Sequence, residues 1–244
     1  MPTDLPPSPI LSRRRLLGGV GAAAASLALS ACTSVPREMA YLAPAEPAGS
    51  KPPMEVSGYE AMYASVVDEG YEIPAIPLKK VDKQYLRRLI DDPTGERPGT
   101  VVVDTSAHYL YLVQENGKAL RYGVGLGRAG FDWAGRAVIQ WKRKWPRWTP
   151  PDAMIGRQPE LERYSAANGG MDPGLKNPLG ARALYIFQNG EDTLYRVHGS
   201  PEWWTIGKSV SSGCVRMMNQ DVMDLYNRVP SKTPILATSG IGVS

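Results

Sequence analysis

The chain contains only two cysteines, two histidines and two phenylalanines among its 244 residues. Scarce phenylalanine together with 25 glycines and 22 prolines favours many short strands and turns over a helical bundle. With 43% hydrophobic and 21% charged residues, the composition fits one globular domain with appended segments and argues against a disordered chain. No internal repeat is visible in the sequence.

Beyond residue 31, dense clusters of basic residues are also lacking, except for the segment WKRKWPRW at 141–148. The formal net charge is +4, of which residues 1–31 supply +2 through three arginines and one aspartate. Basic residues between tryptophans could stack nucleic-acid bases, but a twisted strand with a solvated basic face is the better interpretation.

A long apolar run is absent, and one short run lies in a segment that resembles an export signal. The sequence SRRRLL at 12–17 precedes GGVGAAAASLALSA, and a twin arginine before such a run resembles a bacterial Tat signal. The run falls short of the roughly 20 residues that span a bilayer. The residues LSAC that end at Cys32 resemble a lipobox, which predicts a signal peptide at 1–31 and acylation of Cys32; the alternative is an ordinary cleaved signal peptide.

Export affects what can be inferred about the two cysteines. If Cys32 carries lipid, Cys214 has no partner for an intrachain disulfide. A lone thiol in an oxidising compartment is a liability unless it has a use, which favours a reactive thiol over an inert buried one. Because Thr33 matches no inner-membrane retention signal, we expect a periplasmic lipoprotein at the outer membrane. Export also argues against a nucleic-acid partner.

Composition divides the rest of the chain into three parts. Residues 32–53 are rich in proline and predict an extended tether. Residues 54–97 contain two stretches with helix-like spacing, GYEAMYASVVDEGY and DKQYLRRLI, separated by prolines, and we interpret them as an arm that packs on the main domain. The main domain is expected at 98–244.

The pattern of the main domain predicts mostly strands. Asn116-Gly117 and Asn189-Gly190 predict two hairpin turns. The long irregular excursion at 146–180 is typical of a functional loop or lid. Residues 218–229 predict a helix with Asn219 as its N-cap. The expected strands are 101–104, 109–114 with both faces covered, 120–124, 136–145, and the pair 181–189 and 193–199.

One histidine and the second cysteine stand 16 residues apart in VHGSPEWWTIGKSVSSGCVRM, residues 197–217. Attack by a cysteine on a carbonyl needs a base or cation beside the sulfur, and His198 is the candidate because His108 opens a predicted strand. Gly213 would let the backbone approach a substrate, and the amides of Gly213 and Cys214 could hold an oxyanion. Many proteins contain both residue types by chance, so this pairing alone leaves other uses open.

The residues HGS followed by SVSSGCVRM resemble the signature of YkuD-type L,D-transpeptidases. The segments PGTVVVDTSAHYLYLV, PPDAMI and NPLGARALYIF support the resemblance in the family's order, over about Pro98 to Ala237. The resemblance implies a mainly β fold of packed mixed sheets, sandwich-like, with a few short helices. It implies acyl transfer on diaminopimelate-containing peptidoglycan stem peptides, with no metal and no cofactor.

The resemblance also implies roles for individual residues. Cys214 corresponds to the nucleophile, His198 to the general base, and Gly199 to the residue whose carbonyl orients the histidine. Arg216 matches the family's arginine after the cysteine, which either binds a substrate carboxylate or braces the loop.

This chain departs from the family pattern just before the cysteine. Many members have histidine where this chain has Ser212, so His198 is left as the base and the Ser212 hydroxyl is expected to replace any auxiliary contact. We expect Ser211, Ser212 and Gly213 at the oxyanion and substrate-binding positions.

Three functions remain open. The first is a transpeptidase that forms cross-links or attaches an acceptor amine to the wall; the second is an L,D-carboxypeptidase or hydrolase that trims stems or releases wall-linked protein. The third is a non-catalytic wall-binding lipoprotein, against which the Cys-His pair argues. The excursion at 146–180 and the tryptophans Trp203 and Trp204 are expected to influence the choice of acceptor.

Overall fold

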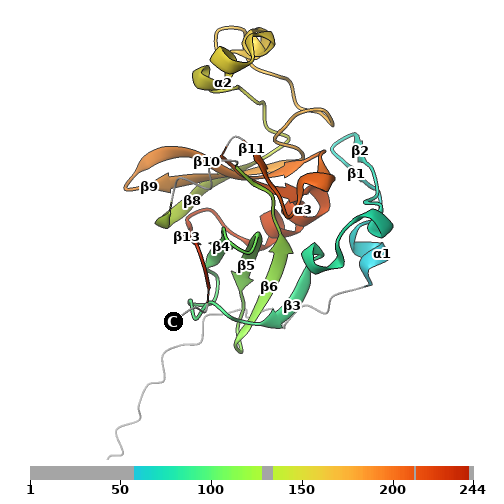
Figure 1. Ribbon diagram of the computed structural model, residues 1–244, viewed down its shortest axis with the longest axis vertical. Coiled ribbons are helices and arrows are strands. Elements are labelled where there is room, and N and C mark those ends of the chain that lie inside the picture. The colour runs from blue at the N-terminus through green and yellow to red at the C-terminus, as the bar shows by residue number, and fades with distance from the viewer. Residues whose placement is uncertain (1–57, 128–133, 212, 242–244) are drawn as a thin grey trace, which may run out of the picture. The chain divides into compact units, whose positions relative to one another are not determined.

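The computed structural model of the protein describes residues 58–127, 134–211 and 213–241 (Figure 1). The predicted signal peptide at 1–31, the tether at 32–53, Cys32 and Ser212 lie outside the described residues.

A mixed nine-stranded sheet dominates the described part of the chain, in the order β12-β10-β9-β8-β13-β4-β5-β6-β3. The pairs β10–β12 and β4–β13 are parallel, and the other neighbours are antiparallel. The strands of this sheet are β3 (Arg88–Asp91), β4 (Val101–Asp104), β5 (Tyr109–Val113), β6 (Lys118–Gly123), β8 (Gly135–Lys144), β9 (Arg182–Gln188), β10 (Glu191–Ser200), β12 (Val215–Met218) and β13 (Thr233–Thr238).

The remaining elements are short. Two small sheets pair β1 (Val66–Asp68) with β2 (Tyr71–Ile73), and β7 (Leu126–Gly127) with β11 (Ser209–Ser211). The helices are α1 (Tyr59–Met62), α2 (Asp152–Arg157) and α3 (Asn219–Arg228), and the 3₁₀ turns are η1 (Leu78–Lys80), η2 (Lys83–Tyr85), η3 (Pro159–Tyr164) and η4 (Trp203–Thr205). The predicted mainly β fold with mixed sheets and a few short helices is confirmed.

The large sheet curls so that distant strands share one apolar core. Leu110 and Leu120, from β5 and β6, belong to the same buried cluster as Ile186 of β9, Met217 of β12 and Leu225 of α3. These strands lie far apart in the sheet order, so the sheet must fold over itself to bring them together (Figure 1). This curled sheet has the sandwich-like character that was expected.

The strand predictions for the main domain are confirmed to within a few residues. Strand β5 is covered on both faces, because Leu110 and Leu112 enter the main core while Tyr111 and Val113 enter a second cluster. Both Asn-Gly turns have positive φ at both residues, as a type I′ hairpin turn requires.

The two helices predicted in the arm are largely wrong. Only the four residues of α1 are helical in the first stretch, and the chain then forms the β1–β2 hairpin, turning at Glu69 and Gly70 with φ of 48° and 87°. In the second stretch, η2 is followed by β3, which pairs antiparallel with β6 at the edge of the large sheet. In both stretches, hydrogen bonding to a neighbouring strand determines the structure in spite of the local helix-like spacing.

Helix α3 lies where it was predicted, but Asn219 is not its N-cap. The cap position is Met218, and the Asn219 side chain instead accepts a hydrogen bond from the Ala181 backbone N–H at 3.0 Å. The excursion at 146–180 contains α2 and η3. Its ends are held together by Asn177, whose Nδ2 donates to the carbonyls of Pro146 at 3.0 Å and Asp172 at 3.1 Å.

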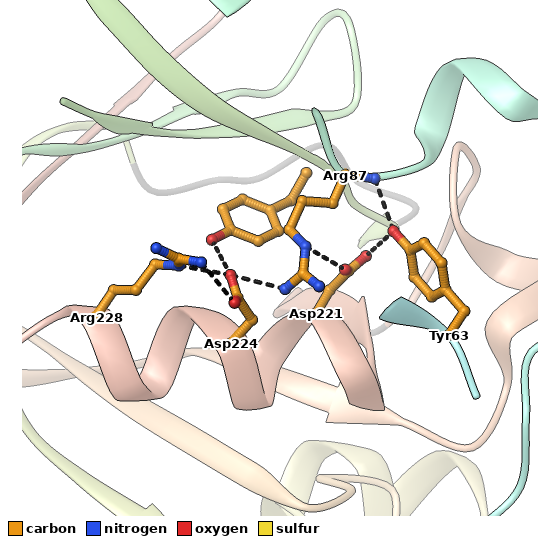
Figure 2. Close-up of polar contacts among 6 residues, drawn as sticks. Tyr63, Arg87, Asp221, Asp224 and Arg228 are labelled. Carbon is orange, nitrogen blue, oxygen red and sulfur yellow. Dashed lines mark hydrogen bonds and ion pairs between the residues drawn. The ribbon is translucent and has the colours of Figure 1, made fainter. Parts of the chain in front are cut away.

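A buried network of charges joins the arm to α3 (Figure 2). Arg87 lies between two carboxylates of the helix, with its Nη1 2.7 Å from Asp224 Oδ2 and its Nε 3.8 Å from Asp221 Oδ1. The Tyr63 hydroxyl donates to Asp221 Oδ2 at 3.1 Å and accepts from the Arg87 backbone N–H at 2.7 Å. Asp221 is fully buried, so the arm is part of the folded core and not a loose attachment.

Candidate active site

Cys214 lies in the turn between β11 and β12. It directly follows Gly213, a position where any other residue would be strained. Gly213 has φ of +134°, and a Cβ at this position would be 3.3 Å from the ring of Tyr195. Both the positive φ and the closeness of the Tyr195 ring favour a residue without a side chain at position 213. Cys214 itself is half-buried. The backbone of Ser211 ends β11, while Ser212 lies outside the described residues, so its predicted substrate contact stays a prediction.

His198 lies in β10 and is held in one tautomer by its neighbour. The side chain is buried, and Nδ1 is 2.6 Å from the carbonyl oxygen of Gly199. A carbonyl can only accept a hydrogen bond, so Nδ1 carries the proton and Nε2 of the neutral ring is left as an acceptor. The Gly199 carbonyl thus prepares the imidazole to take up a proton at Nε2.

The parallel pairing of β10 with β12 brings the predicted residues together. Val197 pairs with Val215, and His198 pairs with Arg216. Residues paired in a sheet point to the same face, as do residues two apart along one strand. Cys214 directly precedes β12, the edge strand of the large sheet, and β12 is the parallel partner of the strand that contains His198.

Burial shifts the pKa values of the pair in opposite directions. It lowers the pKa of His198 to about 4, an effect partly offset by the carbonyls of Gly199 and Pro178 and reinforced by the charges of Arg216 and Arg196. Burial raises the pKa of the Cys214 thiol, while the Arg196 backbone N–H and the same two arginines oppose the rise. At neutral pH both groups are therefore uncharged, a thiol beside a neutral imidazole.

This charge state predicts how Cys214 responds to pH. The rate of its alkylation by iodoacetamide should be slow at pH 7 and still rising above pH 9, because the thiolate forms only above the ordinary thiol pKa of 9.0. Mass analysis of the tryptic peptide Ser209–Arg216 would report this site separately from Cys32. A rate that has already reached its plateau at pH 6 would instead indicate a thiolate–imidazolium pair.

Arg216 has a carboxylate partner within the chain. Its Nη1 donates to Glu202 Oε2 at 2.7 Å, and its backbone exchanges hydrogen bonds with Gly125 at 2.8 and 2.9 Å. This arrangement is the one that bracing of the loop calls for, since the guanidinium already has an anionic neighbour. Glu202 was not singled out from the sequence, although it stands in the PEWW segment beside the predicted tryptophans.

The tryptophans of the PEWW segment have different surroundings. Trp203 packs against a buried cluster that includes Tyr63, Ile76 and Met218. Trp204 is 53% exposed and contacts Trp203 edge-on, with the ring centroids 5.6 Å apart. Trp204 is therefore the one that a ligand can reach.

The basic segment at 141–148 is absorbed by the fold. Strand β8 includes its first half, residues 141–144, as predicted. Lys142 Nζ donates to the carbonyls of Tyr226 and Val229 at the end of α3, Lys144 pairs with Glu69 at 2.7 Å, and Arg147 pairs with Asp172. These partners account for three of its charges.

Comparison of the sequence with models of known protein families gives a match that includes the segments described above. Residues 98–236, more than half of the chain, match the model of the YkuD family, described as the L,D-transpeptidase catalytic domain. The chain belongs to this family. The match includes the segment with His198 and Cys214 and leaves the arm outside it.

Two similar proteins from Escherichia coli are named as probable L,D-transpeptidases. The probable L,D-transpeptidase ErfK/SrfK of Escherichia coli K12 is 30% identical over 147 residues, covering 59% of this chain and 44% of that protein. The probable L,D-transpeptidase YbiS of the same strain is 29% identical over 151 residues, covering 59% of this chain and 45% of that protein. The chain thus spans less than half of each of these relatives. A solved Brucella melitensis structure, named a probable carnitine operon oxidoreductase, is 45% identical, with a TM-score of 0.45 over 63% of this chain and 94% of that one.

In the described part of the YkuD-family chain, no group of three or more histidine, cysteine, aspartate or glutamate side chains is arranged to hold a metal ion. Among the same residues, no helix has the length and apolar character needed to cross a membrane.

Proposed function

We propose that the protein is an L,D-transpeptidase that acts on peptidoglycan stem peptides through a thioester on Cys214. The observation that carries the proposal is that Cys214 directly precedes β12, the parallel partner of the strand that contains His198, and that Gly199 sets the histidine tautomer. Membership of the YkuD family supports it.

In the first half-reaction, Nε2 of His198 accepts the thiol proton while Sγ attacks the carbonyl that joins the L-centre of diaminopimelate to a terminal D-alanine. The backbone N–H groups of Gly213 and Cys214 would meet the charge on the carbonyl oxygen, an effect worth about 3 kcal/mol per donor in comparable sites. The C–N bond then breaks, His198 returns the proton to the leaving amine, and a thioester remains.

In the second half-reaction, an acceptor amine attacks the thioester carbonyl. Its proton passes to His198 and then to Sγ, so the product is released as an amide and the thiol is restored. A neutral resting pair suits this cycle, because the imidazole must be free to accept a proton at the start of each half-reaction.

Incubation with disaccharide-tetrapeptide muropeptides, followed by mass analysis of the products, tests the proposal. Cross-linked dimers with loss of one D-alanine are expected. Shortened monomers alone would mean that water is the acceptor and would identify an L,D-carboxypeptidase. Unchanged muropeptides, with no adduct on Cys214, would leave the wall-binding lipoprotein and contradict the enzyme.

We further propose that the protein is exported and anchored to the periplasmic face of the outer membrane through lipid on Cys32. The twin arginine and the LSAC sequence support this proposal. The proline-rich residues 32–53 would then separate the lipid from the folded part by about 60 Å if extended at 3.1 Å per residue.

Replacing Cys32 with alanine is expected to remove the lipid and release the protein into the soluble periplasmic fraction, because no acylated side chain is left to insert in the membrane. Cell fractionation with detection of the protein, compared with wild type, measures the change. Continued membrane association of the Cys32→Ala protein would contradict the lipobox.

A further inference from the structure

We propose that Tyr85, in the arm that precedes the family-matched residues, is a positioning residue of the active site that acts through the loop 201–208 on Arg216. The inference rests on the proposed function for its catalytic consequence, while the geometry that carries it is independent of the substrate.

Tyr85 ends η2 and fills space that two glycines leave open. A Cβ on Gly207 would be 2.3 Å from Cε2 of the Tyr85 ring, and a Cβ on Gly123 would be 2.5 Å from the Tyr85 Cβ. Real Cβ atoms do not approach other atoms this closely, so Tyr85 can occupy its position only because residues 123 and 207 are glycines. Gly207 belongs to the loop after η4, and Gly123 ends β6.

The contact continues from the loop to Arg216. The Gly207 backbone N–H donates to the Val124 carbonyl at 2.9 Å, and a Cβ on Gly125 would be 2.7 Å from the Thr205 carbonyl oxygen. Gly125 in turn exchanges both backbone hydrogen bonds with Arg216. Gly125 thus lies between Thr205 of the loop and Arg216.

The same loop holds the carboxylate partner of Arg216. The Glu202 backbone is fixed by the Ser200 hydroxyl, which accepts from its N–H at 3.1 Å, and by Thr205, whose Oγ1 donates to its carbonyl at 2.7 Å. The Glu202 side chain then binds Arg216 Nη1. A shift of the loop would therefore move both the backbone support and the ionic partner of Arg216.

Apolar packing makes the arm and the loop one unit. Tyr63 and Leu86 from the arm share a buried cluster with Ile206 from the loop and Met218 from the end of β12. Tyr85 packs on the edge of this cluster. The arm thus reaches the strand that carries Cys214 at one end, although it lies outside the residues that define the family.

Arg216 matters to the chemistry because it faces His198 across the strand pair. Its charge, with that of Arg196, lowers the pKa of both His198 and the Cys214 thiol. Displacing Arg216 should therefore change the reactivity of the thiol even where the fold persists.

The test compares Tyr85→Ala, Tyr85→Phe and Tyr71→Ala in the full chain. Tyr85→Ala should slow muropeptide turnover by about tenfold to a hundredfold, since misplacement by about 1 Å has effects of this size. It should also move the pH profile of Cys214 alkylation up by about half a unit, a threefold lower rate at fixed pH. Tyr85→Phe should behave as wild type because it keeps the ring.

Tyr71→Ala is the matched control in the same arm. Tyr71 packs against Trp145 in a tilted arrangement, with ring centroids 4.1 Å apart, and belongs to a different apolar cluster from Ile206 of the loop. This variant should lower the thermal midpoint but leave the alkylation profile of Cys214 unchanged. Equal effects of Tyr85→Ala and Tyr71→Ala on the profile would overturn the proposal. If Tyr85→Ala does not fold, Tyr85→Leu should show the same shift with a smaller size, and a wild-type profile in that variant would overturn the proposal equally.

The alkylation profile separates the two claims. If the wild-type protein turns over no muropeptide, the proposed function fails, but the profile of Cys214 still reports whether Tyr85 positions Arg216.

Discussion

Replacing Cys214 with alanine is expected to lower muropeptide turnover by on the order of 10⁴-fold or more while the protein stays folded. The thiol is the group that forms the proposed covalent intermediate, and Cys214 is the only cysteine among the residues that the structure describes. The substitution removes one sulfur atom from a half-buried position, so the free energy of unfolding should change by about 1 kcal/mol or less.

Intact-mass measurement with a carbapenem gives this prediction a second readout. The wild-type protein should gain one adduct, and Cys214→Ala should gain none. Cys32→Ala is the matched control, because it removes the other cysteine and leaves the proposed nucleophile, so its adduct should remain. Turnover retained by Cys214→Ala, or an adduct that depends on Cys32, would rule out the mechanism.

The sequence could predict which residues gather at the site because each stands in a locally restricted setting. Gly213 allows the turn before Cys214, and His198 lies near the end of β10 beside Gly199, whose carbonyl is one residue away. The parallel pairing of β10 and β12 could not be predicted from local patterns, since it depends on how the 15 residues between His198 and Cys214 fold back to form a crossover.

The partner of Arg216 was missed for a related reason. Glu202 lies 14 residues earlier in the chain, and nothing in the spacing distinguishes it from other exposed carboxylates. A signal for the close contacts was present in the alternating glycines at 123, 125 and 127, because glycine inside a strand often marks the approach of another backbone. The helix-like spacing in the arm did not predict its strands, because short stretches with such spacing decide little when tertiary pairing is available, as at β1, β2 and β3.

The network in Figure 2 is expected to make stability depend on pH. Burial raises the pKa of Asp221 to about 7 from 3.8, against the opposing effects of Arg87 and Tyr63. A carboxyl whose pKa is higher in the folded state binds more protons when folded, so its contribution to stability is fully present below about pH 4 and is lost as the pH rises to about 7. Asp224 behaves oppositely, because Arg228, Arg87 and Tyr122 hold its pKa below the usual value despite burial.

Replacing Arg87 with methionine should therefore cost more at high pH than at low pH. At pH 8 Asp221 is mostly ionised in the wild-type protein, and loss of the arginine leaves a buried charge without its cation, at a cost of about 3–5 kcal/mol. At pH 5 Asp221 is protonated, so only the contact of Arg87 with Asp224 is lost and the cost should be smaller. Urea unfolding at the two pH values measures the difference.

Asp221→Asn isolates the carboxyl that causes this dependence. The amide oxygen can still accept from the Tyr63 hydroxyl, but the side chain cannot ionise. In the Asp221→Asn background, Arg87→Met should cost the same at pH 5 and pH 8, because the only group of the network that titrates between them is gone. A difference between pH 5 and pH 8 that persists in this background would mean that another group is responsible. If Arg87→Met costs the same at the two pH values in the wild-type background as well, Asp221 does not titrate in this range. The comparison therefore assigns the pH dependence to a single side chain at the junction of the arm and α3.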